Sequence, residues 1–538
     1  MRKVLIATIA SSLMAQQQPP SQDSPQLVLK ATARLVQVSV VVHDKKGQPV
    51  ADLKKEDFQI KVDGHVQPIS LFSVESAGSL PSSPEKLPPN TFTNRLEQRP
   101  GTPSSVTIIL LDAMNTRFTD QSYARQQVIK YLQTIQPTDH IGIYSLSGSL
   151  RVLHDYTTDS TDLLRKLESY KGDVLPSTPS SHEPFGGDSL FLDQWLRGGG
   201  SPAERSFYMT NRIEGTLRAL EFIANHLSRL PGRKNLIWVS GGFPLTIGFE
   251  NLAAWRDPAI EQRTFTDEVN RTVRALNNAN IAIYPVDARG LMVDPRFDAS
   301  RRNVNFNAPL AAPVGVRNQE SMQELASRTG GRAYYNTNDL KNAIRDAVSD
   351  TQVTYTLGFY PSNEKYDSKF HEIKLQVLDR SGLNLRYRKG YFDLPELPQD
   401  ETARRAGLRD AVWSPLDATA VGLTVEVKRV NTPAPNSLEV YVKIDRSSIN
   451  LEQNKNRWAG RLDVLFVQKD NRGNQYRGVT QTIEMNLLRP NYEKVTREGL
   501  IYKQVLERER RANQIRVVVR DAASGSIGSV TVPFDQLR

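Results

Sequence analysis

The sequence contains no cysteine among its 538 residues. This absence excludes disulfide bonds, thiolate zinc sites, iron–sulfur clusters, cysteine nucleophiles and a lipidated N-terminal cysteine. Long hydrophobic runs are lacking too. The apolar stretch from Val4 to Ala15 is about 12 residues long, whereas a membrane-spanning helix needs about 20. The chain is therefore not a polytopic membrane protein.

Common catalytic motifs are also missing from the sequence. It has no G-x-S-x-G, no H-E-x-x-H, no G-x-x-x-x-G-K-[ST] and no G-x-G-x-x-G after a predicted strand. An excess of 69 Lys and Arg over 59 Asp and Glu gives a formal charge of only +10, which is too small to indicate nucleic-acid binding. We therefore predict a protein that is not an enzyme and does not bind nucleic acid.

The first residues have the layout of a secretory signal peptide. Arg2 and Lys3 precede the apolar run, and polar Gln, Pro and Ser residues follow it. We expect a signal peptide at residues 1–15, cleaved after Ala15, with an uncleaved anchor as the alternative. The mature chain would have no transmembrane span and would be periplasmic, cell-surface or secreted.

The distribution of apolar, Pro and Ser residues divides the remaining chain into segments. Alternating apolar residues predict a small N-terminal β-domain at 27–75, and a Pro/Ser-rich linker follows at 77–105. After a central segment at 106–352, residues 353–395 are strand-like and are expected to extend or flank the sheet of that segment. Alternation of apolar and polar residues returns at 400–538, which predicts a C-terminal β-sandwich.

Between these segments, residues 106–352 alternate buried strands with amphipathic helices. This pattern predicts an α/β domain with a doubly wound, mostly parallel, Rossmann-like sheet and helices on both faces. Gly-, Ser- and Pro-rich residues at 171–202, and a second segment at 291–316, are expected to be inserted loops. Because ligands bind beyond the carboxyl ends of parallel strands, we searched the ends of the strands VTIILLD, NLIWVSGG and IAIYPVD for a site.

Polar residues gather at these strand ends. Asp112 closes the first strand and is followed by Asn115 and Thr116, while Ser240 and Asp287 close the other two. The strand order and the phrase PGRKNLIWVSGGFP resemble a von Willebrand factor A (VWFA)-type domain, of the divergent A-related kind found in exported bacterial proteins with a flanking β-domain. The resemblance covers roughly residues 27–395.

The resemblance implies a metal-ion-dependent adhesion site built from a D-x-S-x-S strand end, a later Thr and an Asp in a T-D-G turn. Asp112 and Thr116 match the first motif, and Thr210 is the best match to the later Thr. However, Met114 replaces a Ser and Gly241 replaces the Asp, which removes oxygen ligands and charge. We expect a degenerate site with no firmly bound cofactor. Mg²⁺ or another divalent cation is the alternative, and Asp112 and Thr116 would otherwise cap the following turn.

We predict an exported, non-enzymatic adhesion or scaffold protein that binds a protein partner through the rim of the A-type domain. The expected rim residues are Asp112, Asn115, Thr116, Thr210, Ser240 and Asp287. Two alternatives are a self-assembling envelope component that pairs through exposed β-edges, and an enzyme using the Asp112 and Asp287 carboxylates. The basic runs Arg508 to Arg516 and Arg386 to Tyr391 could instead bind an anionic envelope glycan or lipid surface.

Overall fold

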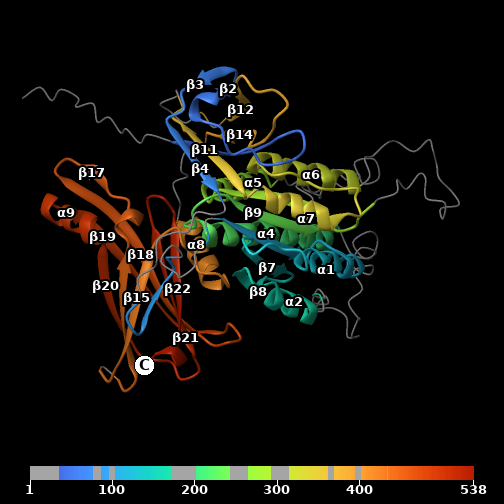
Figure 1. The fold of residues 1–538 in the computed structure, drawn as a ribbon. Coiled ribbons are helices and arrows are strands. Elements are labelled where there is room, and N and C mark those ends of the chain that lie inside the picture. The colour runs from blue at the N-terminus through green and yellow to red at the C-terminus, as the bar shows by residue number, and fades with distance from the viewer. Residues whose placement is uncertain are drawn as a thin grey trace, which may run out of the picture.

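The computed structural model describes residues 35–76, 87–95, 103, 105–170, 172, 202–242, 265–291, 314–361, 367, 369–393, 401–432 and 434–537. The expected signal peptide and most of the expected linker and inserted loops lie outside these residues. Within them, no helix is both long and apolar enough to cross a bilayer. The chain is a mixed α/β protein whose central sheet contains parallel strands, as predicted, and β-rich units lie on two sides of that sheet (Figure 1).

The central domain is built on a five-stranded sheet with the strand order β10-β9-β6-β7-β8. The first four strands run parallel, and β8 returns antiparallel to β7. Every residue of the three middle strands is buried, which explains why apolar residues predominate in them and why their polar residues lie mostly near the strand ends. The strands are β6 (Val106–Asp112), β7 (Ile141–Leu146), β8 (Leu150–Thr157), β9 (Lys234–Ser240) and β10 (Ile281–Asp287).

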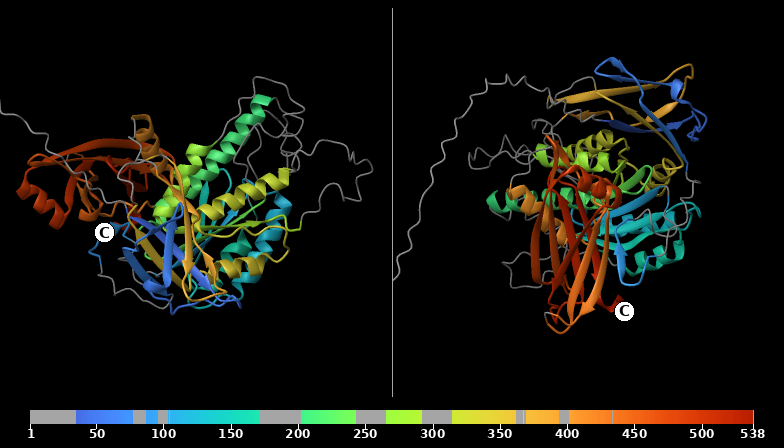
Figure 2. Two further views of the ribbon diagram at one scale, coloured as in Figure 1. Left: turned by 90° about the horizontal axis from the view of Figure 1, so that it is seen from above. Right: turned by 90° about the vertical axis from the view of Figure 1, so that its left-hand side faces the viewer.

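Helices cover both faces of this sheet and create two apolar cores (Figure 2). One core joins the sheet to α4 (Pro202–Leu227), α5 (Thr266–Asn278) and α6 (Val314–Thr329). The other joins it to α1 (Phe118–Leu132), α2 (Ser160–Ser169) and α7 (Leu340–Ser349). The sheet is thus fixed from both sides, which gives the carboxyl ends of its strands a rigid support.

Residues 332–336 lie beside β10 and make one parallel bridge to it, between Tyr334 and Val286. The two glycines after α6 explain how the chain reaches this position. Gly330 has a φ of 81°, and a Cβ atom on Gly331 would lie 1.9 Å from the carbonyl oxygen of Ile283. Only glycine permits so close an approach to the neighbouring strand.

The N-terminal β segment does not form a domain by itself, and residues 353–395 do not extend the parallel sheet. Instead, the two segments pair into one β-sandwich of two four-stranded sheets, β13-β1-β11-β4 and β14-β12-β2-β3, which we call the first sandwich. Alternation predicts that a segment is a strand but carries no information about its partner, so the sequence could not show this closure. Its strands are β1 (Val36–His43), β2 (Phe58–Val62), β3 (His65–Gln67), β4 (Leu71–Ser76), β11 (Val353–Phe359), β12 (Phe370–Val377), β13 (Asn384–Arg386) and β14 (Gly390–Phe392), with the 3-10 turn η1 (Lys55–Asp57).

The C-terminal sandwich packs two antiparallel sheets around an apolar core. One strand comes from the expected linker, because β5 (Thr91–Thr93) pairs with β15. The other strands are β15 (Leu423–Val430), β16 (Ser437–Ile444), β17 (Glu452–Asn454), β18 (Arg457–Lys469), β19 (Gln475–Leu487), β20 (Leu500–Leu506), β21 (Gln514–Asp521) and β22 (Ile527–Pro533). Two helices, α8 (Glu401–Trp413) and α9 (Arg489–Glu498), and the turns η5 (Arg446–Ser448) and η6 (Phe534–Gln536) complete it.

Candidate functional site

The crest of the central sheet consists of the carboxyl ends of β6, β9 and β10 and the described loop residues after them. It comprises Asp112–Thr116, Ser240–Gly242 and Asp287–Leu291. Parallel pairing sets Ser240 beside Asp287, and the same register puts Asp112 on the other side of Ser240. The fold therefore brings three of the predicted polar strand ends into one row.

The Asp112 carboxylate is buried and surrounded by protein donors. Its Oδ2 accepts hydrogen bonds from Asn115 Nδ2 at 2.7 Å, Trp238 Nε1 at 2.9 Å and Ser240 Oγ at 3.0 Å. Its Oδ1 accepts one from the Asn115 backbone N–H at 3.0 Å. Both oxygens of the carboxylate are therefore hydrogen-bonded within the protein, and Oδ2 carries three of the four donors.

Burial dominates the electrostatics of Asp112. Removal from water raises the pKa of this carboxyl, and the hydrogen bonds from Asn115, Trp238 and Ser240 act in the opposite direction by stabilising the ionised form. The same donors fix the loop that follows β6. Asp112 thus organises the crest as an internal anchor.

Asn115 extends this network to helix α4. Its side-chain N–H donates to Thr216 Oγ1 at 2.9 Å, and its carbonyl oxygen accepts from both Nε and a terminal nitrogen of Arg212 at 3.3 and 3.2 Å. Thr216 is fully buried, whereas Thr210 lies more than one helical turn earlier and is half-buried. The threonine that α4 contributes to the network is therefore Thr216 instead of the predicted Thr210.

Thr116 and Gly241 close the other side of the crest. Thr116 Oγ1 accepts a hydrogen bond from the Gly241 backbone N–H at 2.8 Å. A Cβ atom on Gly241 would lie only 2.8 Å from the carbonyl oxygen of Asn115, so the backbones touch where the resembled family carries an acidic side chain. This close contact requires glycine and leaves no room for a third-motif carboxylate.

Asp287 has a partner of its own. Arg289 donates from Nε and a terminal nitrogen to the two carboxylate oxygens at 2.9 and 2.7 Å, and its backbone N–H also donates to Oδ1. Asp287 and Asp112 are separated by the whole of β9, which is about 9.5 Å at the usual strand spacing. The crest therefore holds two separately satisfied carboxylates and no close pair.

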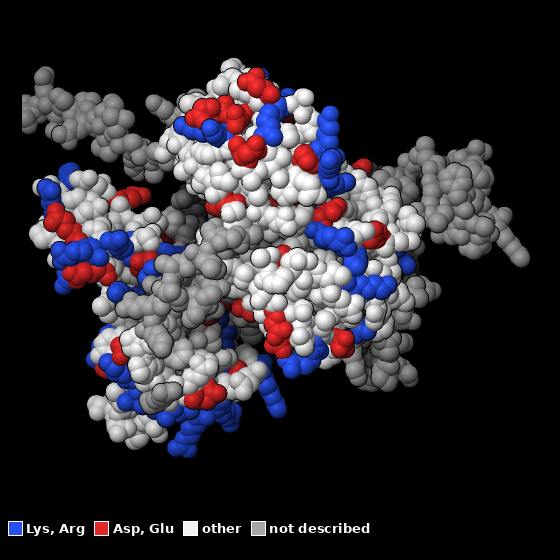
Figure 3. Space-filling model, viewed as in Figure 1, with Lys and Arg blue, Asp and Glu red and all other residues white. Residues whose placement is uncertain are grey.

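Several cations of the basic runs are engaged inside the protein. Arg386 binds both oxygens of buried Asp350 at 2.7 and 2.8 Å, and this pair joins the first sandwich to the end of α7. Burial lowers the pKa of Arg388 to about 10. Arg516 is 3% exposed and donates to Asp417, Ser529 and the Leu416 carbonyl. On the face drawn in Figure 3, acidic and basic side chains are interspersed.

Sequence reasoning missed Trp238, Thr216 and Arg212. Trp238 was visible in the strand NLIWVSGG, but only the twist and packing of the sheet show that its indole N–H points to the end of β6. Arg212 and Thr216 lie four residues apart and so share a helix face. That spacing was the available signal, yet the α4 register against β6 was needed to use it.

Comparison with known proteins leaves the family unassigned. No family model matches the chain, and no curated protein matches it. An aerotolerance-related membrane protein from Bacteroides fragilis is 15% identical, with 45% of this chain and 98% of that one aligned and a TM-score of 0.24. BatB from Bacteroides thetaiotaomicron is 13% identical, with 46% and 97% aligned and a TM-score of 0.24. A von Willebrand factor type A protein from Catenulispora acidiphila is 10% identical, with 64% and 80% aligned and a TM-score of 0.25.

Proposed function

We propose that this chain is an exported, non-enzymatic interaction protein that binds a protein partner through the crest of a VWFA-like, Rossmann-like central domain. The observation that carries the proposal is the fourfold satisfaction of the Asp112 carboxylate by protein donors. A crest fixed in this way is rigid without a cation, as expected of a degenerate metal-ion-dependent adhesion site. A partner then binds a preformed surface, so little free energy of binding is lost in ordering that surface.

The crest also presents an apolar contact residue. Leu291, at the end of the segment after β10, is 61% exposed, although its backbone N–H is held by Asn338 Oδ1 at 3.0 Å. An exposed apolar side chain on a fixed backbone suits a protein interface, because loops carried on rigid elements commonly provide specificity.

Replacing Leu291 by serine is expected to weaken partner binding at least tenfold, because an apolar anchor of an interface is lost. Full-length protein would be crosslinked in an envelope extract and the captured partner identified by mass spectrometry, with Ile501→Ser as the matched control. Ile501 is 65% exposed but lies on β20 of the C-terminal sandwich. Capture that is reduced equally by both substitutions would contradict a crest interface, and N-terminal sequencing of the mature protein would test export.

Mg²⁺ and Ca²⁺ are expected to leave the crest unchanged. At about 5 to 10 millimolar, several times the roughly 1 millimolar dissociation constant of the weakest calcium sites, neither ion should shift the melting temperature of the wild type relative to Asp112→Asn. The physical reason is that the buried carboxylate already accepts four hydrogen bonds from protein donors, so a hard cation would have to compete with donors on either oxygen. If a cation raises the melting temperature of the wild type but not of Asp112→Asn, the prediction is wrong and the crest binds a metal ion.

One feature favours self-assembly as a second candidate function. Strand β19 is long, mostly exposed and, among the described residues, pairs only with β18, so it presents a free sheet edge. Light scattering across a wide concentration range separates the two functions. A monomer at all concentrations supports the crest proposal, and a reversible increase in mass supports pairing through β-edges.

A further inference from the structure

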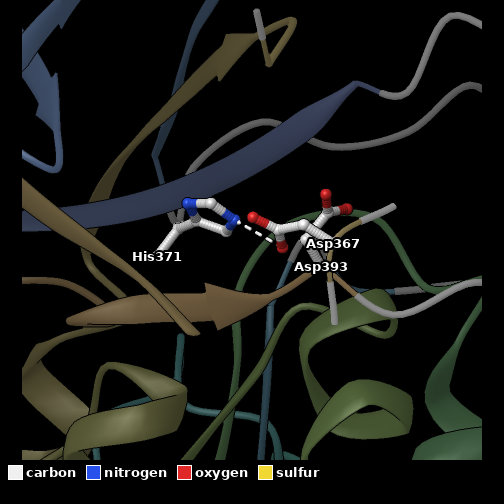
Figure 4. Close-up of side chains that lie close together, drawn as sticks. All are labelled: Asp367, His371 and Asp393. Carbon is white, nitrogen blue, oxygen red and sulfur yellow. Dashed lines mark hydrogen bonds and ion pairs between the residues drawn. The ribbon is translucent and has the colours of Figure 1, made fainter. Parts of the chain in front are cut away.

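A second cluster of polar side chains lies in the first sandwich, away from the crest. It consists of Asp367 just before β12, His371 on β12 and Asp393 just after β14. One potential ligand atom from each residue lies within 4.8 Å of the other two. Figure 4 shows the imidazole of His371 facing the two carboxylates. Among the described residues this is the group of His, Asp and Glu side chains whose spacing suits a metal ion.

The strands bring these residues together from distant parts of the segment. β12 and β14 are antiparallel neighbours, with His371 opposite Tyr391. Their pairing continues where the Asp393 backbone N–H donates to the Lys369 carbonyl at 2.9 Å. Because the pairing carries Asp393 to the start of β12, its carboxylate arrives beside Asp367. His371 and Asp393 are 8% and 4% exposed, and only Asp367 reaches the surface.

His371 is oriented as metal-binding histidines are. Its Nδ1 lies 2.7 Å from Asp63 Oδ2, and the other oxygen of Asp63 accepts the Glu372 backbone N–H at 2.9 Å. The Tyr391 ring stacks on the imidazole with centroids 5.2 Å apart. A carboxylate that accepts a hydrogen bond from the Nδ1–H group fixes the tautomer and leaves Nε2 with a lone pair for a metal ion. Here Nε2 points to Asp367 Oδ1 at 3.1 Å.

We propose that Asp367, His371 and Asp393 bind a divalent transition-metal cation, with Zn²⁺ the preferred ion and Asp63 as the positioning residue for His371. One imidazole nitrogen and two carboxylates are ligands that zinc accepts, whereas the hard cations Mg²⁺ and Ca²⁺ prefer oxygen alone. Tetrahedral ligands of zinc lie roughly 3.4 Å apart. The 3.1 Å between His371 Nε2 and Asp367 Oδ1 is close to this value. The ligand atom of Asp393 lies within 4.8 Å of those of the other two residues, so metal binding would have to draw this carboxylate closer. Water completes the coordination.

The position of the site suggests its role. Asp393 is the last described residue before α8, where the chain passes to the C-terminal sandwich. A metal ion bound here would link the beginning of β12 to the end of β14 and fix the point at which the chain leaves the first sandwich. Metal binding should therefore stabilise this edge against local unfolding.

The test uses the full chain, without an affinity tag and after chelator treatment. Isothermal titration with ZnCl₂, checked by elemental analysis, should give one ion per chain. Asp367→Asn and Asp393→Asn should each weaken binding at least tenfold. Asp63→Asn should weaken it 10- to 100-fold, as loss of a carboxylate behind a ligating histidine does. Co²⁺ should give a visible absorption band whose intensity indicates four- or five-fold coordination, and millimolar Mg²⁺ should not displace it.

Two matched controls come from the same sandwich. His65 and Glu56 are both exposed, so His65→Asn and Glu56→Gln should bind Zn²⁺ like the wild type. Melting of each variant without metal shows whether it folds, and Asp367→Asn, at a partly exposed position, is the variant least prone to disturb the sandwich. The proposal is overturned if the wild type shows no saturable binding. It is also overturned if Asp367→Asn and Asp393→Asn bind as tightly as the controls, which would leave His371 as a cation held between Asp63 and Asp367.

Discussion

Replacing Asp112 by alanine is expected to lower the free energy of unfolding of the central domain by about 3 to 5 kcal/mol, near the upper limit for one substitution. The change leaves four hydrogen-bond donors without their acceptor, and Trp238 and Ser240, which supply two of them, are fully buried. Asp112→Asn keeps the shape of the side chain but turns an N–H group toward these donors. This variant should therefore lower the free energy of unfolding by less than Asp112→Ala does.

Because the chain has several domains, its unfolding has to be followed domain by domain. Hydrogen exchange of peptides from β6 and β9 reports the central domain directly. Asp267→Ala is the matched control, because Asp267 lies exposed in the first turn of α5. If Asp112→Ala and Asp267→Ala differ by less than about 1 kcal/mol, roughly one ordinary hydrogen bond, the anchoring role of Asp112 is wrong.

Replacing Lys234 by methionine is expected to stabilise the protein most below pH 7 and progressively less toward pH 10. Lys234 begins β9 and is fully enclosed, with its Nζ donating to the Leu230 carbonyl at 2.7 Å. Burial lowers the pKa of Lys234 to about 7, although the nearby Glu75 carboxylate acts to raise it. In the unfolded chain the pKa of lysine is about 10.4.

The direction of this pH dependence follows from the number of protons bound by the folded and the unfolded chain. Between pH 7 and 10.4 the unfolded chain holds a proton on Lys234 that the folded chain has released, so wild-type stability rises with pH in this window. Below pH 7 the folded protein carries a buried ammonium at a cost of about 5 kcal/mol, from roughly 1.4 kcal/mol per pKa unit. The difference in melting temperature between Lys234→Met and the wild type should therefore shrink from pH 6 to pH 9.

The variant also leaves Glu75 without its cation. Burial already raises the pKa of Glu75, so Lys234→Met/Glu75→Gln is needed to separate the two effects. The double variant should show the same pH trend with a larger stabilisation. Lys469, whose pKa burial lowers to about 8, lies in the C-terminal sandwich and is present in every variant, so it cancels in the comparison. If the difference in melting temperature between Lys234→Met and the wild type is constant across pH, the lowered pKa of Lys234 is contradicted.

Much of the central domain could be predicted from the sequence, because its signals are local. The expected strands VTIILLD and IAIYPVD coincide with β6 and β10, since strands that are buried on both faces are rich in apolar residues along their whole length. The polar residue at each strand end was also visible, and Asp112, Asn115, Thr116 and Ser240 do lie together. The expected VWFA-type function of the crest stays a proposal.

The sequence by itself determined most of the strands and helices of the central domain, because periodic burial is encoded within a few residues. Only the tertiary structure decided which strands pair, and hence that residues 36–76 and 353–392 form one sandwich. It also decided that Trp238 donates to Asp112, that Thr216 holds Asn115, and that Asp63 and Asp393 meet at His371. Such contacts depend on side-chain packing between segments far apart in the chain, and local patterns contain no record of a distant partner.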